Sequence, residues 1–152
     1  MTVHATPPEF PVRFESARLV RFSDCDPAGM VFYPQYFVML NALVEDWFTH
    51  GLGVNYAQFL GARRLGLPMA RLQAEFKAPS RMGETVNFAL ALHRLGRRSL
   101  ELGIECRGTQ SDLRWHATAV IVTTSLDTDG SINIPQDVVE GIHRWQRHQG
   151  EN

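Results

Sequence analysis

Residues 36–44 read Tyr-Phe-Val-Met-Leu-Asn-Ala-Leu-Val, and this stretch decides the fold of the chain. Its apolar side chains fall on nearly every side of a helical wheel, which is typical of a helix buried on all sides. Pro34 suits the first turn of such a helix, and Gly51 suits the position just past its end. A single domain that buries a helix completely needs a second layer of structure wrapped around it.

The segments after the helix alternate between apolar and polar residues, and this pattern predicts half-buried β-strands. In residues 70–78 the even positions are apolar and the odd positions are polar. The same alternation recurs in residues 86–92 and 100–106, and residues 115–126 are apolar on both faces, as in a central strand. Turn-forming stretches separate these strands at residues 80–83, 96–98 and 108–112. Turns of this length suit hairpins, so we expect an antiparallel sheet.

Three further elements complete the expected layout. An irregular first strand is expected near residues 12–22, a short second helix near residues 56–64, and an amphipathic surface helix after Pro135. The alternating βα order of a nucleotide-binding fold is absent. We therefore predict an α+β domain of residues 12–150, in which a five-stranded antiparallel sheet wraps around a long buried helix. Residues 1–11 are expected to form a flexible leader.

Composition and charge exclude several classes of protein. Hydrophobic residues make up 44% of the chain and charged residues 20%, which favours a globular core over disorder. The net charge of -1 argues against a nucleic-acid partner, whose phosphates need a basic face. No apolar run approaches the roughly 20 residues of a membrane span, and no signal-peptide pattern is present. Cys25 and Cys106 are therefore expected to be reduced thiols in the cytoplasm.

The residues that can carry chemistry join the first strand to the buried helix. Residues 24–36 read Asp-Cys-Asp-Pro-Ala-Gly-Met-Val-Phe-Tyr-Pro-Gln-Tyr. The unpaired N–H groups of the first helical turn, around Tyr33, carry about half a positive charge and can stabilise an oxyanion. Asp26 precedes them on a Pro-Ala-Gly turn, where its carboxylate can face the same point. Such a carboxylate can attack a carbonyl carbon directly or activate a water molecule to do so.

Simpler interpretations of this segment stay open. An aspartate in an Asp-Pro-Ala-Gly turn often makes only a local hydrogen bond. Asp24 and Asp26 could form a metal pair, but no histidine or third acid stands nearby to complete a site for a hard cation. Cys25 could act as a nucleophile, but no histidine lies close to it in sequence, so we expect a buried, inert cysteine.

The whole segment resembles the signature of the 4-hydroxybenzoyl-CoA thioesterase type of hotdog enzyme, Asp-Cys-Asp-Pro-Ala-Gly-(aliphatic)-Val-(aromatic)-Tyr-Pro-(Asn/Gln)-Tyr. The resemblance implies an acyl-CoA thioesterase that uses no cofactor and forms its site between the subunits of a homodimer or homotetramer. It places the catalytic carboxylate on Asp26 and the backbone N–H that holds the thioester carbonyl on Tyr33. Other branches of the superfamily have a histidine at the position of Tyr33, so the chain looks more like the hydroxybenzoyl branch.

The resemblance also implies substrate-binding residues. Arg97 and Arg98 match the basic cluster that binds the nucleotide end of coenzyme A, although two solvated arginines on a turn are the alternative. Asn41 stands where the family has an aspartate that meets the para-hydroxyl of the substrate ring. Its amide can still form hydrogen bonds but brings no charge. We therefore expect a preference for benzoyl or hydroxybenzoyl groups over straight chains.

Two other functions fit the same fold. A hotdog hydratase or dehydratase needs a histidine as proton carrier at the active turn, and Tyr33 and its neighbours offer none. A non-catalytic acyl-CoA-binding protein is expected to lack the carboxylate, and Asp26 is present. The sequence therefore favours hydrolysis of an acyl-CoA thioester, without a metal and without a nucleic-acid or membrane partner.

Overall fold

The computed structural model describes residues 12–148, so the predicted leader lies outside the described part of the chain. The elements, in chain order, are β1 (Arg13–Leu19), the 3-10 helix η1 (Phe22–Asp24), α1 (Tyr33–Asp46), the π-helical turn η2 (Trp47–Gly51), α2 (Tyr56–Leu60), β2 (Leu65–Gly66), β3 (Met69–Phe76), β4 (Thr85–Leu95), β5 (Ser99–Arg107), β6 (Leu113–Val122), β7 (Thr124–Ser125) and α3 (Gln136–His148). Among these residues no helix is long and apolar enough to cross a membrane.

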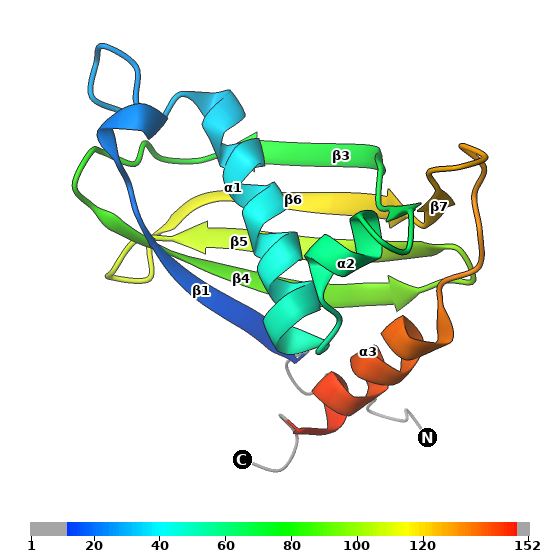
Figure 1. Ribbon diagram of the computed structural model, residues 1–152. Coiled ribbons are helices and arrows are strands. Elements are labelled where there is room, and N and C mark those ends of the chain that lie inside the picture. Colours follow the sequence, from blue (N-terminus) through cyan, green and yellow to red (C-terminus); the bar gives the residue numbers. More distant parts are fainter. Residues whose placement is uncertain (1–11, 149–152) are drawn as a thin grey trace, which may run out of the picture.

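The main sheet has five strands in the order β1-β4-β5-β6-β3, and every neighbouring pair is antiparallel. The helix α1 crosses one face of this sheet, and α3 lies beyond the C-terminal end of α1 (Figure 1). The strands β2 and β7 form a separate small sheet. The α+β class, the antiparallel five-stranded sheet and the long helix across it are therefore as predicted.

Alternation along the strands builds a single core between the sheet and α1. The side chains of Leu100, Leu102, Ile104 and Cys106 in β5 all point inward and are buried, as their spacing predicts. The C-terminal helix joins the same core, because the rings of Trp47 and Trp145 meet edge to face with their centroids 5.4 Å apart. Burial of each large apolar side chain contributes roughly 1.5–3 kcal/mol to folding.

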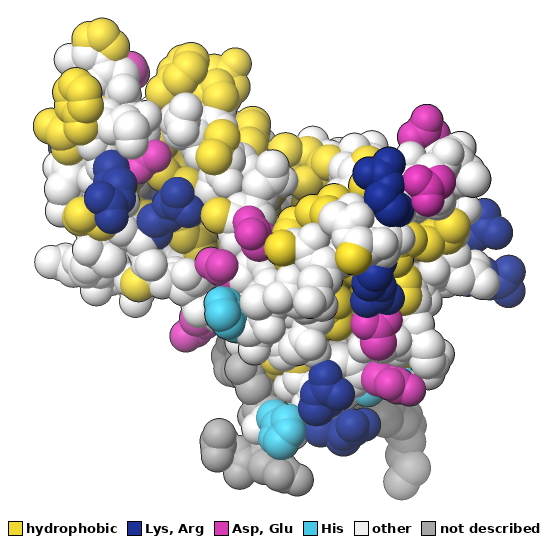
Figure 2. Space-filling view, viewed as in Figure 1, with side chains coloured by type: hydrophobic (Ala, Val, Ile, Leu, Met, Phe, Trp, Pro, Cys, Tyr) yellow, Lys and Arg dark blue, Asp and Glu magenta, His cyan; other side chains and the backbone are white. Residues whose placement is uncertain are grey.

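The helix α1 is buried on one face rather than on all sides, which corrects the expectation from its composition. Tyr36, Leu40 and Leu43 pack toward the sheet, but Tyr33 is 59% exposed and Val38 is 54% exposed. The apolar face continues onto β3, the edge strand, through Met69 and Phe76. We call Tyr33, Val38, Met69 and Phe76 the α1–β3 surface. Figure 2 shows hydrophobic side chains gathered over the first turns of α1.

Several predicted boundaries and one predicted hairpin are wrong. The first strand ends at Leu19 without a register shift, and the last long strand ends at Val122 rather than continuing to residue 126. The second helix is shorter than expected and ends at Leu60. Residues 80–83 do not close a hairpin, because β3 pairs with β6 while β4 pairs with β1. This connection instead crosses from one edge of the sheet toward the other.

Candidate active site

Residues 25–31 form a tight turn that projects from the end of η1. Cys25 and Val31 pair in an antiparallel bridge, and the N–H of Asp26 donates to the carbonyl oxygen of Met30 at 2.9 Å. The N–H of Gly29 donates back to the carbonyl oxygen of Asp26, also at 2.9 Å. Gly29 has a φ of 78°, in the left-handed region that glycine adopts without strain. The turn therefore has one defined conformation with Asp26 at its start.

The carboxylate of Asp26 is half-buried and keeps one oxygen free of protein partners. Its Oδ1 accepts a hydrogen bond from the N–H of Ala28 at 2.8 Å. This is the local bond that the simpler interpretation of the turn expects. No residue of 12–148 donates to the other oxygen, Oδ2. The local bond fixes the orientation of the carboxylate, and Oδ2 remains available for a water molecule or a substrate carbonyl carbon.

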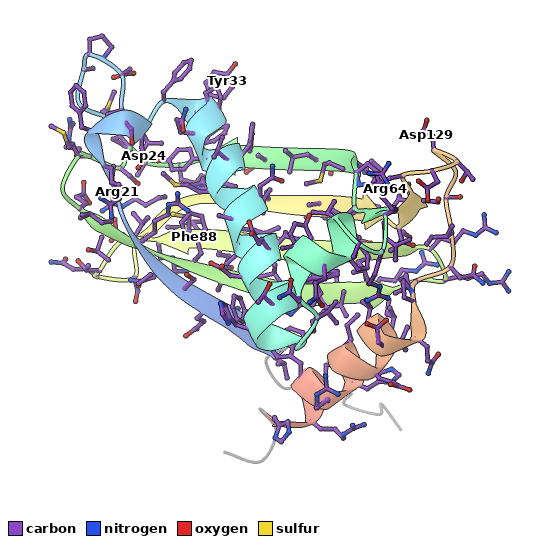
Figure 3. The ribbon with its side chains drawn as sticks, in the orientation of Figure 1. Arg21, Asp24, Tyr33, Arg64, Phe88 and Asp129 are labelled. Carbon is purple, nitrogen blue, oxygen red and sulfur yellow. The ribbon has the colours of Figure 1, made fainter. Side chains whose placement is uncertain are left out.

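Asp24 connects the turn to the helix and is itself buried. Its Oδ2 accepts the N–H of Arg21 at 2.9 Å, and its carbonyl oxygen accepts the N–H of Phe32 at 2.9 Å. Phe32 is the N-cap of α1, so Asp24 determines where the helix begins relative to the turn. Figure 3 shows Asp24 beneath the start of α1, with Tyr33 above it.

The first turn of α1 offers a free backbone donor. The N-cap residue Phe32 supplies no side-chain cap, and Pro34 has no N–H. Tyr33 is the first helical residue, and within residues 12–148 its N–H meets no acceptor. The helix dipole adds about half a positive charge at this point. The turn with the free carboxylate oxygen is linked to this helix end through the backbone bond between Asp24 and Phe32, and a carboxylate and an uncapped N–H together can bind a carbonyl oxygen while its carbon is attacked.

Cys25 is not arranged as a nucleophile. Its Sγ donates to the carbonyl oxygen of Arg21 at 3.4 Å. Partial burial raises the pKa of the Cys25 thiol, and the charges of Asp24 and Asp26 raise it further. The residue is half-buried rather than buried as expected, but its thiol stays protonated at neutral pH. Across residues 12–148 no group of three or more His, Cys, Asp or Glu side chains is placed to hold a metal ion.

Asn41 lies in a cleft on the exposed side of α1, away from the turn. It is roughly 12 Å further along the helix than Tyr33, at the rise of about 1.5 Å per residue of an α-helix. The cleft has a volume of about 700 Å³, and its polar lining includes Glu45, Tyr56 and Thr124 besides Asn41. Burial raises the pKa of Tyr56, and the charge of Glu45 raises it further. The cleft therefore presents a neutral amide, a neutral phenol and a carboxylate.

The connection between β4 and β5, which carries Arg97 and Arg98, lies at the opposite end of the sheet from the segment before α1, which carries Asp26 (Figure 1). They follow β4, whose 11 residues span roughly 35 Å. The Arg98 guanidinium donates to Ser131 Oγ at 3.1 Å and to Asn133 Oδ1 at 3.3 Å. The Arg97 side chain is exposed and pairs with none of the described residues. A single chain therefore does not bring these arginines to Asp26.

The segment that sequence analysis missed is the connection between β3 and β4. The N–H of Val31 donates to the carbonyl oxygen of Ser80 at 2.9 Å, and the N–H of Met82 donates to the carbonyl oxygen of Gly29 at 3.1 Å. Met30 and Arg81 form an antiparallel bridge. The Asp26 turn thus rests on a segment about fifty residues later in the chain. No local pattern of residues signals such a pairing.

Comparison with known proteins identifies the family. A family model described as the thioesterase-like superfamily matches residues 20–142. The chain belongs to the thioesterase-like superfamily. A curated relative of this thioesterase, the 1,4-dihydroxy-2-naphthoyl-CoA hydrolase of Prochlorococcus marinus (strain MIT 9313), is 29% identical over 140 residues, covering 88% of this chain and 89% of the relative.

Solved structures of other thioesterases share the fold. A 1,4-dihydroxy-2-naphthoyl-CoA thioesterase from Synechocystis superposes with a TM-score of 0.78 at 20% identity, covering 86% of this chain and 96% of that one. A 4-hydroxybenzoyl-CoA thioesterase variant in complex with 4-hydroxybenzoyl-CoA superposes with a TM-score of 0.77 at 23% identity. The match covers 86% of this chain and 98% of that one. The predicted hotdog family and the predicted class of enzyme, an acyl-CoA thioesterase, are confirmed.

Proposed function

We propose that this thioesterase hydrolyses an aromatic acyl-CoA to the free acid and coenzyme A in the cytoplasm, with Asp26 as nucleophile or general base. The observation that carries the proposal is the free oxygen of Asp26 on a turn bonded to the uncapped N-terminus of α1. Two free cysteines, Cys25 and Cys106, suit a reducing compartment. The names of the relatives, which act on naphthoyl- and hydroxybenzoyl-CoA, support an aromatic acyl group.

In this mechanism the thioester carbonyl oxygen accepts the N–H of Tyr33. The negative charge that grows on that oxygen in the transition state meets the positive end of the helix dipole. Asp26 either attacks the carbonyl carbon itself or takes a proton from a water molecule that attacks it. If Asp26 attacks, the carbon–sulfur bond breaks to give a mixed anhydride between Asp26 and the acyl group, and water then hydrolyses this anhydride to release the acid and restore the carboxylate. If Asp26 activates water, the water oxygen enters the acid directly and the proton held by Asp26 passes to the leaving group. In both routes coenzyme A leaves as a thiolate that takes up a proton.

Replacement of the carboxylate tests the assignment of Asp26. We expect Asp26→Asn to lower kcat by at least about 10²-fold, because the amide keeps the turn but cannot act as base or nucleophile. Acyl-CoA binding should persist, since the helix N-terminus and the arginines are unchanged. Thiol release and equilibrium binding measure the two effects.

Asp24→Asn is the matched control for this variant. Its amide oxygen can still accept the N–H of Arg21, so we expect a far smaller loss of kcat. An Asp26→Asn enzyme that keeps more than a tenth of the activity, together with an inactive Asp24→Asn enzyme, would show that the catalytic acid is wrongly assigned.

The active enzyme is proposed to be a homodimer or homotetramer. The α1–β3 surface leaves Tyr33, Val38 and Phe76 about half exposed, and apolar surface gathered in this way is typical of an interface. The free edge of β3 beside it can pair with another strand. A second copy could also bring its arginines to the Asp26 turn, which a single chain does not do.

We expect light scattering at micromolar concentration to give a mass at least twice the 17.2 kDa of one chain. Val38→Glu should shift the mass toward one chain, because it places a charge on a side chain that is 54% exposed and leaves the core intact. Ala57→Glu, on the exposed side of α2, is the control and should keep the wild-type mass. A monomeric wild-type enzyme would contradict the proposal.

Asn41 is proposed to meet a polar group on the acyl ring. An amide forms hydrogen bonds without requiring charge on its partner, so we expect benzoyl-CoA and hydroxybenzoyl-CoA both to be better substrates than straight-chain thioesters. Comparison of kcat/KM across an acyl-CoA panel measures this preference. A higher value for hexanoyl-CoA than for every aromatic thioester would contradict it.

Arg97 and Arg98 are proposed to bind the phosphates of coenzyme A. Their replacement by alanine should raise KM for acyl-CoA and leave kcat nearly unchanged, because phosphate contacts stabilise ground and transition states alike. Arg97→Ala is the cleaner variant, since Arg98 also holds Ser131 and Asn133. With a truncated thioester that lacks the phosphates, KM should be the same in the variant and the wild type. An equal rise in KM for both substrates would exclude a phosphate-binding role.

A further inference from the structure

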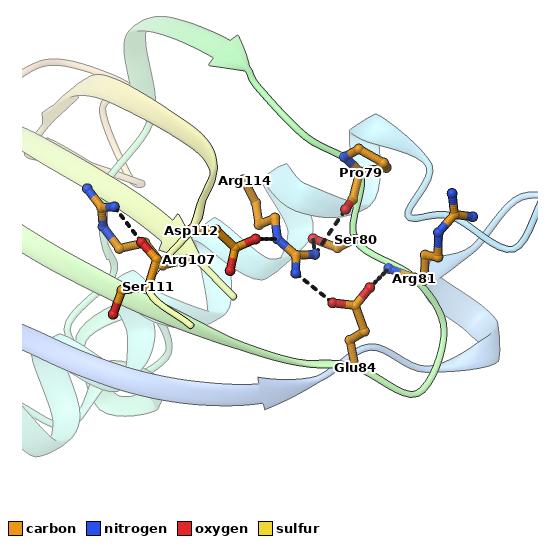
Figure 4. Close-up of polar contacts among 8 residues, drawn as sticks. All are labelled: Pro79, Ser80, Arg81, Glu84, Arg107, Ser111, Asp112 and Arg114. Atoms are coloured by element: carbon orange, nitrogen blue, oxygen red, sulfur yellow. Dashed lines mark hydrogen bonds and ion pairs between the residues drawn. The ribbon is translucent and has the colours of Figure 1, made fainter. Parts of the chain in front are cut away.

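Arg114, near the start of β6, is surrounded by acceptors at the end of the sheet that carries the Asp26 turn. Its side chain is 12% exposed. Nη1 donates to the carbonyl oxygen of Pro79 at 2.9 Å and to Ser80 Oγ at 3.3 Å, while Nη2 donates to Glu84 Oε2 at 2.7 Å (Figure 4). Nε donates to Asp112 Oδ2 at 2.6 Å. These hydrogen bonds hold the pKa of Glu84 and of Asp112 below their usual values, so both carboxylates stay charged at neutral pH.

The same arginine holds the whole connection between β3 and β4. Its carbonyl oxygen accepts the N–H groups of Lys77 at 2.8 Å and of Ala78 at 3.1 Å. The remaining oxygen of Glu84, Oε1, accepts the N–H of Arg81 at 2.9 Å and so closes the loop. We call residues 77–84 the brace segment. Arg114 contacts this segment near its beginning, at its middle and at its end.

The brace segment is in turn bonded to the Asp26 turn. Ser80 is fully buried and accepts the N–H of Val31, and Arg81 pairs with Met30. Burial raises the pKa of Tyr36, in the first turns of α1, and the neighbouring Ser80 acts to lower it, so the brace segment also lies against this helix. Movement of the brace segment would therefore displace both the stem of the turn and the helix that carries the oxyanion donor.

We propose that Arg114 is a positioning residue of this thioesterase, which fixes the Asp26 turn against the N-terminus of α1 through the brace segment. The proposal rests on the proposed role of Asp26. Arginine suits this position because a planar guanidinium presents donors in several fixed directions, which a lysine ammonium does not. Its removal would leave the buried Ser80 hydroxyl and the Pro79 carbonyl without their charged donor.

Arg114→Gln tests the proposal against Arg63→Gln. Arg63 also forms a paired ion contact, with Asp137 at 2.7 and 2.8 Å, but far from the turn. Misplacement of a reacting group by about 1 Å can cost up to 10²-fold in rate. We expect Arg114→Gln to lower kcat by about 10- to 100-fold with little change in KM. Arg63→Gln should lower Tm by a similar amount to Arg114→Gln but leave kcat unchanged. Wild-type kcat in Arg114→Gln would overturn the proposal.

A double variant separates positioning from general destabilisation. If Arg114 acts through Asp26, Arg114→Gln should lower kcat far less in an Asp26→Asn background than in the wild type, since residues that act as a unit are not additive. An equal fold loss in both backgrounds would overturn the proposal. If Asp26→Asn alone were fully active, the proposed function itself would fail, which is a distinct result.

Arg114→Lys decides the question if the glutamine variant does not fold. The lysine keeps the charge beside Glu84 and Asp112 but reaches fewer acceptors. We expect a folded enzyme with unchanged KM. Its kcat should lie between the wild-type value and the value expected for Arg114→Gln. If Arg114→Lys kept the full wild-type kcat, a positive charge alone would be sufficient. The planar guanidinium of Arg114 would then not be needed to position the Asp26 turn.

Discussion

The packing of one face of α1 against the inner face of the sheet holds the rest of the molecule in place. The Tyr36 ring stacks on Phe76 and packs at a tilt against Trp115, with ring centroids 5.9 and 5.2 Å away. The buried leucines of α1 continue this contact toward Trp47. The first turn of the same helix carries the free N–H of Tyr33. The packing that buries these side chains therefore also places the proposed oxyanion donor.

The N-terminus of α1 lacks a stabilising side-chain cap. A serine, threonine or aspartate at the N-cap would stabilise α1 by about 1 kcal/mol. Phe32 occupies that position and supplies no cap. Instead, the N–H of Gln35 donates to the carbonyl oxygen of Phe32 at 2.8 Å and the N–H of Phe32 donates to the carbonyl oxygen of Asp24 at 2.9 Å, and neither bond blocks the donor at Tyr33. Neighbouring segments, rather than a local cap, hold this end of the helix.

Local patterns in the sequence predict what depends on near neighbours. The alternation in β5, the apolar stretch of α1 and the Asp26 turn all follow from spacing within a few residues. The course of residues 80–83 does not, because their partners at Gly29 and Val31 lie about fifty positions away. The exposure of Val38 could not be predicted either. Composition alone does not distinguish a side chain in the core from one on an uncovered apolar face. The proposed role of Arg114 depends on the first of these features, the course of residues 80–83.

One side of α1 packs in the core, and the other side lines the cleft that is proposed to meet the acyl group. Leu40 and Leu43 are buried in the core, whereas Asn41 and Glu45 are exposed to the cleft on the other side of the same turns. A substitution at Asn41 or Glu45 changes the chemistry of the cleft without removing any contact of the core. Evolution can therefore adapt such a chain to a new acyl group by single exchanges that leave folding intact, so relatives with one fold can diverge in their substrates.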